Sequence, residues 1–234
     1  MRILITRPEE DAAMLGEKLQ ARGHQVTGLP MISIDYLRPD MQMTGTPAAA
    51  HVFTSANGVR AAVKAGVDVQ MAYAVGPATA AACQTAGWDN IITGTGDVDG
   101  LVATILAAPP EGRILHISGR DKAGDLLGSL RQAGLPADNL VLYRAVARTV
   151  FAPETVSAIR NGQFDAVLFY SSRTAQIFIS LAQQAGLQDC LAAMAAGCLS
   201  PAVAEYAGKA GFAPVWTAAR PTEEALLEAL PQAG

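Results

Sequence analysis

Short phrases that carry hydroxyl groups and glycine follow several apolar runs in this sequence. Residues 54–58 (TSANG) and 170–173 (YSSR) each stand between a run of strand-forming residues and a helix-like segment. Residues 76–79 (GPAT) and 199–201 (LSP) stand in the same position, with a proline placed for the first turn of a helix. Small polar residues in such places cap helices, and the free amides of a helix start also bind anions. The four phrases therefore predict helix caps, an anion-binding edge, or both.

Basic residues could supply a second set of anion ligands, because arginine binds carboxylates through two parallel hydrogen bonds. Several of them fall at expected strand ends or in linkers instead of on helix faces. These residues are Arg7, Arg120, Lys122, Arg144, Arg148, Arg173 and Arg220. Gathered on one edge they would form an anion-reading cleft, whereas each one taken singly also fits a solvated surface charge.

Tyr143 is a further candidate, and it lies in an apolar, extended stretch, residues 140–148. The ordinary role of such a residue is that of a core or interface aromatic whose hydroxyl has a partner. A phenol in this place could alternatively donate a proton across a cleft.

The sequence offers little for metal or nucleotide chemistry. No C-x-x-C spacing occurs, and the cysteines and histidines are scattered at Cys83, Cys190, Cys198, His24, His51 and His116. Neither a zinc site nor a disulfide framework is predicted. The stretch 94–100 (GTGDVDG) has the spacing G-x-G-x-x-x-G, which is not that of a dinucleotide fingerprint. A turn with an Asp or Thr cap is the better interpretation, and the chain contains no Walker A or G-x-S-x-G motif.

Composition places the chain among folded, globular proteins. Its 234 residues are 50% hydrophobic and 16% charged, which is enough for one large domain or two small ones. The net charge of −4 argues against a broad surface for nucleic acid or an anionic membrane. The start of the chain lacks the pattern of a secretory signal, and no apolar run is long enough to span a bilayer. We expect a reduced, cytoplasmic location.

Apolar runs alternate with amphipathic segments along the whole chain. The expected strands are residues 2–6, 25–29, 51–54, 73–75, 90–93, 113–118, 140–143, 166–170, 194–196 and 214–217. Most are continuous apolar runs followed by a segment of helix length, as in a parallel sheet that is covered on both faces. The predicted fold class is therefore α/β, with parallel sheets built from βαβ units.

The chain also repeats itself. Four landmarks recur in the same order: 2–6 with 113–117, 52–57 with 168–173, 77–87 with 201–211, and Thr93 with Thr217. Four matches in register predict an internal duplication, and the alternative is the general self-similarity of βαβ proteins. Residues 31–39 and 140–148 stand outside the repeat and look like a pair of strands between domains.

Taken together, these phrases resemble the uroporphyrinogen-III synthase family. The resemblance covers essentially the whole chain and depends on the order of the phrases more than on any one of them. The matching stretches are 3–8 (ILITRP), 53–59 (FTSANGV), 75–77 (VGP) with Thr79, 142–144 (LYR), 169–171 (FYS), and 221–222 (PT) with 225–226 (AL).

This resemblance implies an α/β fold of two flavodoxin-like, parallel-sheet domains joined by a two-stranded β connector. It also implies that the domains exchange their first units, so that residues 1–35 join 147–234 in one discontinuous domain. Residues 36–146, with the connector strands, would form the other domain, and a simple halving at residue 112 would be wrong. The active site is expected in the cleft between the two domains.

By the same resemblance the chain cyclises the linear tetrapyrrole hydroxymethylbilane to uroporphyrinogen III, with loss of water and inversion of ring D through a spiro intermediate. This activity is that of a hydro-lyase of porphyrin and haem biosynthesis, and it needs no cofactor and no metal. We expect a cytoplasmic monomer that binds the small molecule hydroxymethylbilane but neither nucleic acid nor a membrane. A transient contact with the upstream hydroxymethylbilane synthase is also implied.

Site residues carry over from the family by position. Tyr143 is the candidate catalytic residue, as the group that assists departure of the hydroxyl. The expected substrate-binding residues are Arg7, Thr54, Ser55, Asn57, Gly76, Pro77, Gly119, Arg120, Ser171, Ser172, Ser200 and Pro201. Helix starts and arginines suit a substrate that carries eight carboxylates.

The sequence departs from the family pattern at two places. Residues 200–203 read SPAV where many members have Gly-Pro-Thr-Thr, so the threonine hydroxyl is missing. Asn57 stands where some members have an arginine. The competing hypothesis is a non-catalytic, two-lobed protein that binds an anionic tetrapyrrole, and a two-domain nucleotide enzyme is the third.

Overall fold

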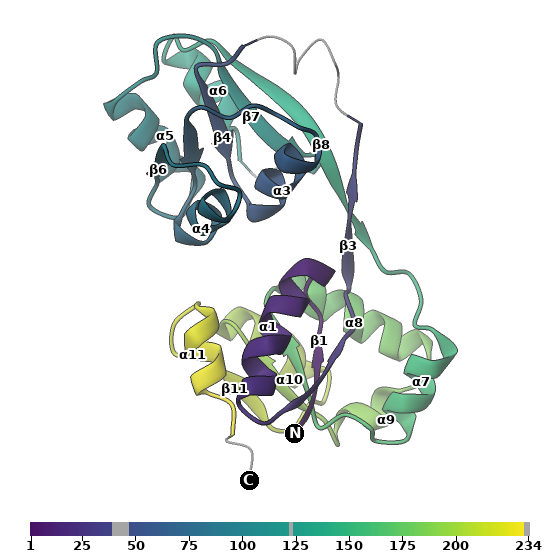
Figure 1. The fold of residues 1–234 in the computed structure, drawn as a ribbon. Helices are drawn as coiled ribbons and strands as arrows, with labels where there is room; N and C mark the ends of the chain where they lie inside the picture. Colours follow the sequence, from purple (N-terminus) through teal and green to yellow (C-terminus); the bar gives the residue numbers. More distant parts are fainter. Residues whose placement is uncertain (39–46, 122–123, 232–234) are drawn as a thin grey trace. The chain divides into compact units, whose positions relative to one another are not determined.

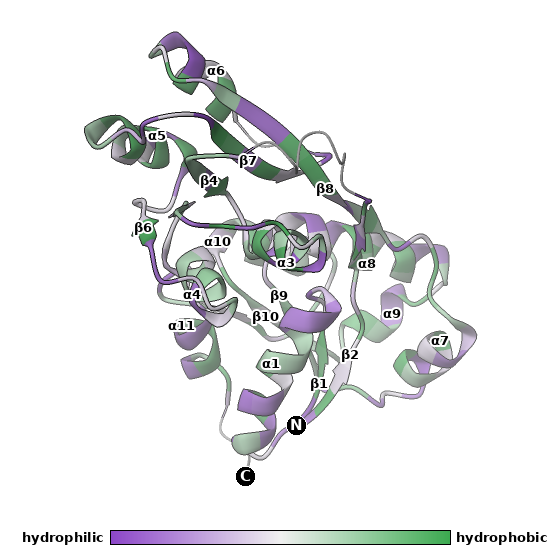
Figure 2. Cartoon of the chain, turned by 45° about the horizontal axis from the view of Figure 1, so that its top comes forward, coloured by the Kyte–Doolittle hydropathy of each residue, from purple (hydrophilic) through white to green (hydrophobic). Residues whose placement is uncertain are grey.

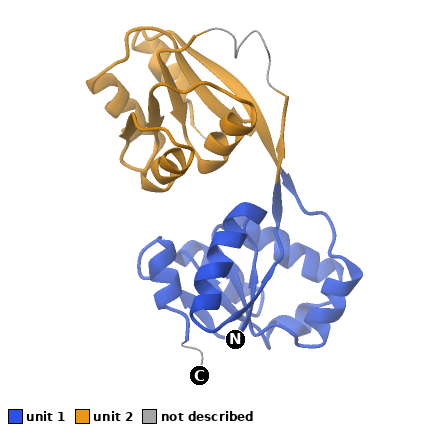
Figure 3. Cartoon of the chain, viewed as in Figure 1, with its two compact units in different colours: residues 1–33, 146–234 blue, residues 34–145 orange. Residues whose placement is uncertain are grey.

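The computed structural model describes residues 1–38, 47–121 and 124–231, which form two compact units (Figure 1; Figure 3). Unit 1 contains residues 1–33 and 146–234, and unit 2 contains residues 34–145. The chain leaves unit 1 within strand β3 (Ile32–Tyr36) and returns to it within β8 (Ala137–Ala147). Pro39 and Lys122, which belong to features noted in the sequence, lie outside the described residues.

Unit 1 is built on a five-stranded parallel sheet with the order β11-β10-β9-β1-β2. Its strands are β1 (Arg2–Ile5), β2 (Gln25–Gly28), β9 (Ala166–Phe169), β10 (Ala195–Cys198) and β11 (Val215–Thr217). Its helices are α1 (Glu9–Ala21), α7 (Pro153–Arg160), α8 (Ser172–Gln184), α9 (Gln188–Leu191), α10 (Pro201–Lys209) and α11 (Glu223–Glu228).

Unit 2 is built on a sheet with the order β3-β8-β7-β4-β5-β6, in which the five strands β4 to β8 run parallel. Its other strands are β4 (Ala50–Phe53), β5 (Ala72–Ala74), β6 (Ile91–Thr93) and β7 (Ile114–Gly119). Its helices are α3 (Ala56–Lys64), α4 (Pro77–Thr85), α5 (Val98–Ala107) and α6 (Leu126–Gln132). The predicted α/β class with parallel sheets is therefore confirmed.

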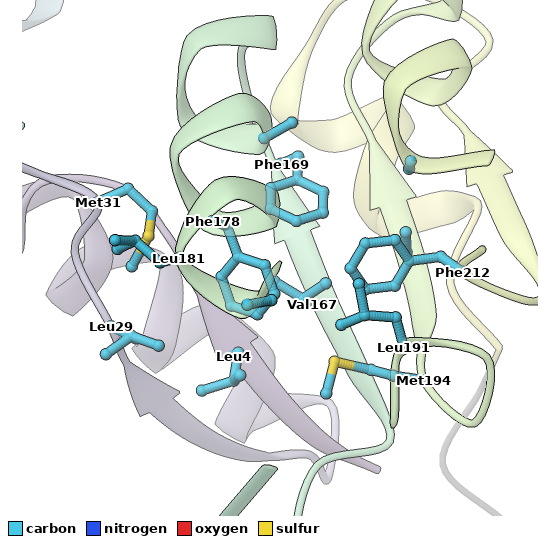
Figure 4. Close-up of a cluster of buried hydrophobic side chains, with 14 of the residues drawn as sticks. Leu4, Leu29, Met31, Val167, Phe169, Phe178, Leu181, Leu191, Met194 and Phe212 are labelled. Carbon is cyan, nitrogen blue, oxygen red and sulfur yellow. The ribbon is translucent and has the colours of Figure 1, made fainter. Parts of the chain in front are cut away.

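Each sheet has a hydrophobic core on both faces, as the continuous apolar strands predict. In unit 1, Phe169 of β9 packs against both Phe178 and Phe212, with ring centroids 5.5 and 5.7 Å from its own (Figure 4). In unit 2, β4 and β7 are buried along their whole length, and their apolar residues are green in Figure 2. Because both faces are covered, the open part of each sheet is its edge at the strand ends.

The two sheets repeat one order of strands. Strands β6-β5-β4-β7-β8 of unit 2 correspond in position and direction to β11-β10-β9-β1-β2 of unit 1. The equivalent strands are those that the sequence repeat pairs. For example, residues 52–57 contain the end of β4 and the turn after it, and their counterparts 168–173 contain the end of β9 and the turn after it. The arrangement agrees with the predicted internal duplication. It also shows that β1 and β2 complete a sheet with strands from the far end of the chain.

Strands β3 and β8 are neighbours at the edge of the second sheet. The amide of Leu37 donates to the carbonyl of Leu142 at 2.8 Å, and the guanidinium of Arg144 donates to Asp35. Farther along, the amide of Arg148 donates to the carbonyl of Met31 at 2.9 Å. Among the helices described, none is long and apolar enough to cross a membrane.

Candidate active site

A cavity of about 470 Å³ lies in unit 2 at the carboxyl end of its parallel sheet. Thr54 and Ser55 follow β4 and line the cavity, and Ser118 and Gly119 line it from the end of β7. Tyr143 of β8 and the starts of α5 and α6 complete its walls. The carboxyl edge of a parallel sheet is where open α/β folds bind ligands. Four of the predicted site residues, Thr54, Ser55, Gly119 and Tyr143, are brought together here.

The hydroxyl of Tyr143 lies 2.8 Å from Oγ of Ser55. Ser55 is also the N-cap of α3, and its Oγ accepts a hydrogen bond from the amide of Gly58 at 3.2 Å. Since that oxygen already accepts from an amide, its own hydrogen can point at the phenol oxygen. The serine therefore ties Tyr143 to the first turn of α3 and could stabilise negative charge on the phenol oxygen.

His116 forms a second pair of polar side chains in the cavity. Its Nε2 lies 3.3 Å from Oγ1 of Thr54, and its side chain is buried in the middle of β7. Two residues later, the hydroxyl of Ser118 donates to Oδ1 of Asn139 at 2.9 Å. His116 and Ser118 are two positions apart in β7, so their side chains point to the same face of the sheet.

Aspartates form the rim of the cavity on the side of the helix starts. Asp97 is the N-cap of α5 and accepts from the amide of Gly100 at 2.7 Å, and Asp125 caps α6 by accepting from Gly128 at 2.9 Å. Asp121 also lines the cavity. No Lys or Arg occurs among the described residues that line it. The cap by Asp97 confirms the predicted turn with an Asp cap in residues 94–100.

Other predicted site residues of unit 2 lie beside the cavity and do not line it. Gly76 and Pro77 are the N-cap and the first residue of α4, as their sequence predicts. Asn57 lies inside α3, where its Oδ1 accepts from Arg60 at 2.9 Å. The amide of Arg120 donates to the carbonyl of Tyr143 at 2.9 Å, while the residue itself is exposed.

The predicted residues of unit 1 lie at the carboxyl edge of its own sheet. Ser171 is the N-cap of α8, accepting from the amide of Thr174 at 3.2 Å, and Ser172 is the first residue of that helix. Ser200 and Pro201 hold the same two positions in α10, where the serine side chain makes no capping hydrogen bond. These helix starts confirm the predicted caps at Ser55 and Ser171.

Arg7, at the end of β1, has two carboxylate partners within unit 1. Its guanidinium donates to Asp11 and to Glu223, both at 2.9 Å, and its carbon Cζ lies 4.5 Å from the centroid of the Tyr170 ring. Burial, and next the charge of Glu223, raise the pKa of Tyr170, against a smaller lowering by Arg7. The charge of Arg7 is thus largely balanced before any ligand arrives.

Sequence reasoning did not single out three residues that the cavity uses, namely His116, Asp97 and Asp125 as lining groups. His116 was considered only as a possible metal ligand, because spacing along the chain does not show which residues line a cavity. A usable signal was present for the two aspartates, because both stand at helix starts on the same edge of the sheet. Within the described ranges, no group of three His, Cys, Asp or Glu side chains could hold a metal ion.

The arrangement supports proton transfer and positioning. A phenol with a serine partner stands at one wall, a buried imidazole with a threonine partner at another, and carboxylates at the rim. Such groups can donate a proton to a leaving oxygen and hold pyrrole N–H donors in place.

Comparisons with known proteins agree with this picture. The chain resembles the solved uroporphyrinogen-III synthetase of Helicobacter pylori 26695, with 17% identity and a TM-score of 0.64 over 97% of each chain. It also resembles a mutant uroporphyrinogen III synthase of the thermophile Thermus thermophilus, with 20% identity and a TM-score of 0.53 over 97% of this chain and 96% of that one. At these identities the likeness shows the fold. No curated protein gave a significant match.

The family is shown by a different comparison. The family model described as uroporphyrinogen-III synthase HemD matches residues 13–228, which include parts of both units and the whole cavity. A match over nearly the whole chain identifies it: the chain belongs to the uroporphyrinogen-III synthase family.

Proposed function

We propose that the cavity of unit 2 carries out the reaction of this family on hydroxymethylbilane, with Tyr143 assisting departure of the hydroxyl from ring A. Family membership makes the chain a cyclising lyase of tetrapyrrole biosynthesis. The observation that carries the proposal is the pairing of the Tyr143 hydroxyl with Ser55 at the wall of the cavity.

The first step needs a proton on the leaving oxygen. The O–H of Tyr143 donates its proton to the hydroxyl on ring A, the C–O bond breaks, and water departs, so that ring A becomes an azafulvene cation and Tyr143 a phenolate. Phenols are weak acids at neutral pH, so a hydrogen bond donated by Ser55 to the phenol oxygen would stabilise the charge that develops there. When ring closure later releases a proton from the reacting carbon, the phenolate recovers it, and the residue ends the cycle unchanged.

The rest of the reaction is a matter of geometry. The substituted carbon of ring D attacks the azafulvene, and the spiro intermediate opens and closes again with ring D inverted. The chain without enzyme cyclises without inversion, so the protein must hold the two rings in the less accessible arrangement and exclude water. A cavity of about 470 Å³ is of the size that takes a drug-sized ligand. Hydroxymethylbilane is larger, and we place only its reacting end there.

The polar lining fits that end of the substrate. Asp97 and Asp125 offer carboxylate oxygens to pyrrole N–H groups and to positive charge on the azafulvene. With no Lys or Arg among the described lining residues, the substrate carboxylates require other sites. The starts of α4, at Gly76 and Pro77, and of α8, at Ser171, present backbone amides for this purpose. Pro77 itself has no N–H and only fixes the first turn of its helix.

The remaining substrate contacts that we propose come from residues outside the cavity lining. They are Arg7, Asn57, Arg120, Ser172, Ser200 and Pro201. At Ser200 and Pro201 the amides of α10 would bind a carboxylate, which makes the threonine hydroxyl of other family members dispensable. Arg7 would bind a carboxylate by exchanging one of its present partners, Asp11 or Glu223.

The non-catalytic binding protein is not favoured, because the family match spans both units. A cytoplasmic location and a transient contact with the enzyme that supplies hydroxymethylbilane remain part of the proposal. The contact would shorten the time during which the unstable substrate cyclises on its own.

A coupled assay tests the function. Hydroxymethylbilane is generated in situ, the protein is added, and the oxidised products are separated into uroporphyrin isomers I and III by chromatography. Predominant isomer III is expected. Isomer I at the rate of the enzyme-free control, with intact substrate and folded protein, would overturn the proposal, and saturable tetrapyrrole binding without turnover would then support the binding protein.

A further inference from the structure

Tyr143 does not follow the simple alternation of its strand. Leu140 and Leu142 of β8 are buried in the cluster beside α3, so strict alternation would send the next side chain to the opposite face. Tyr143 nevertheless packs against the same cluster. A feature of the backbone must turn it there.

That feature is a β-bulge between β7 and β8. Ser118 pairs with Val141, but Gly119 pairs with Tyr143, so Leu142 is an extra residue on β8. A bulge of this kind bends a strand and re-aims the side chain that follows. Here it places the ring of Tyr143 directly against Gly119.

The ring occupies the space that a side chain at position 119 would need. A Cβ atom built on Gly119 would lie 2.8 Å from Cε2 and 2.9 Å from Cζ of Tyr143, closer than such atoms approach in proteins. The backbone itself does not require glycine, because Gly119 is not among the residues with positive φ. Glycine is needed here to make room for the phenol ring.

We propose that Gly119 is a positioning residue, whose missing side chain lets the bulge seat the Tyr143 phenol against Ser55 at the wall of the cavity. The catalytic part of this inference rests on the proposed function, in which Tyr143 donates the proton. The positioning itself stands on the contacts of the ring alone.

An alanine at position 119 should therefore displace the ring of Tyr143 and little else. Its methyl group would press on the outer end of a side chain and not on the backbone, so the ring can move while β7 keeps its hydrogen bonds. The expected product is a folded protein in which the phenol has left its place 2.8 Å from Ser55. Gly28→Ala is the matched control, since Gly28 also ends a strand and a Cβ there would meet nothing within 4 Å.

The first experiment needs no activity. The protein has five tyrosines, and labelling their rings with carbon-13 gives a small set of NMR signals, of which Tyr143→Phe identifies one. Gly119→Ala is expected to shift that signal and leave the other four in place, whereas Gly28→Ala shifts none. A Tyr143 signal that stays unchanged in Gly119→Ala would overturn the inference.

The second experiment measures turnover. Gly119→Ala is expected to lower kcat by about tenfold with KM little changed, because a misplaced catalytic group loses rate more than binding. In the Tyr143→Phe background the same substitution should cause no further loss. An equal loss in both backgrounds would show that Gly119 acts independently of the phenol and would contradict the proposal.

A stability measurement covers the case in which Gly119→Ala folds poorly. With the ring removed by Tyr143→Ala, the substitution Gly119→Ala should no longer lower the free energy of unfolding in urea. If it lowers that free energy as much as it does in the wild type, the glycine is required for another reason and the inference fails. Should the wild type make no isomer III, the proposed function fails, while the NMR and stability results still decide the positioning.

Discussion

Ser55 and Tyr143, 88 positions apart in the chain, share a hydrogen bond of 2.8 Å between their hydroxyl oxygens. The serine holds its place as the cap of α3, and the tyrosine holds its place through the bulge in β8. Two independent backbone features, a helix cap and a β-bulge, thus position the two hydroxyl oxygens. Substitutions of Ser55 and of Tyr143 can separate the contribution of each residue to turnover.

Tyr143→Phe keeps the ring and removes the proton. We expect kcat to fall by about 100-fold, at the lower end of what a positioned general acid contributes, without loss of all activity. Isomer III should remain the main enzymatic product, because the shape of the cavity still orients the rings. The measurement is kcat at saturating hydroxymethylbilane, with Tyr206→Phe on the exposed face of α10 as control. Unchanged turnover would remove Tyr143 from the mechanism.

Ser55→Ala removes a helix cap and the partner of the phenol together. The lost cap should lower the free energy of unfolding by about 1 kcal/mol. The lost hydrogen bond should lower kcat about fivefold, the equivalent of about 1 kcal/mol. Thr222→Ala serves as control, since Thr222 caps α11 in the same way at 3.3 Å and lies outside the proposed site. It should lose stability but keep its kcat, and an equal fall in kcat for both variants would show that the effect of Ser55 is only structural.

Substitutions of Arg7 and of Glu223 should change KM in opposite directions, which tests whether Arg7 binds substrate. Glu223 accepts from Arg7 at 2.9 Å and from Lys18 at 2.6 Å, so it competes with any substrate carboxylate for the guanidinium. Arg7→Gln should raise KM, whereas Glu223→Gln should lower it. Both should reduce the free energy of unfolding by about 1 kcal/mol, as partly buried ion pairs near the surface do. A KM that rises in both variants would mean that Arg7 acts only by holding α1 and α11 to the sheet.

His51 should make the protein sensitive to acid. Burial lowers the pKa of this histidine to about 4, from an ordinary value of 6.5, and its Nδ1 has no hydrogen-bond partner within the described part of the chain. Because the folded-state pKa is the lower one, the unfolded chain takes up a proton first as the pH falls below 6.5. The free energy of unfolding should therefore drop by about 3 kcal/mol between pH 7 and pH 4 from this group, and it should be unaffected above pH 7.

The check on His51 is a difference between two pH profiles. Urea unfolding is measured from pH 7.5 to 4 for the wild type and for His51→Leu, so that carboxylates titrating in both proteins cancel. The variant should lose part of the acid sensitivity. If the free energy of unfolding falls equally with pH in both proteins, His51 is not the source of the acid sensitivity.

Periodicity and repetition were sufficient to predict the parallel sheets and most helix starts. The strands at 2–6 and 166–170 are β1 and β9 with bounds shifted by one residue, and Ser55, Ser171, Pro77 and Pro201 begin the helices that their types indicate. These features depend on local preferences, which a sequence displays directly.

What could not be predicted depends on contacts between distant segments. The bulge that turns Tyr143 arises from the register of two strands, and neither strand shows it alone. Whether an arginine is available to a ligand likewise depends on its neighbours: Arg7 meets Glu223, which lies 216 positions later, and Arg144 meets Asp35. His116 has as its partner Thr54, which follows a different strand of the sheet. Charge and hydroxyl groups were visible in the sequence, but their partners were not.

The crossing of the chain between the units also sets an order of events during synthesis. Unit 2 is continuous and can fold once residue 145 has emerged, whereas β1 waits for β9, whose Ala166 pairs with Ile3. At roughly 5–20 residues per second, the ribosome takes on the order of 10 s to pass from β2 to β9. Through that interval the apolar edge of β1 has no neighbour on one side, which is the condition under which strands pair with the wrong partner. The N-terminal segment is thus the part of unit 1 that waits longest during synthesis for a neighbouring strand.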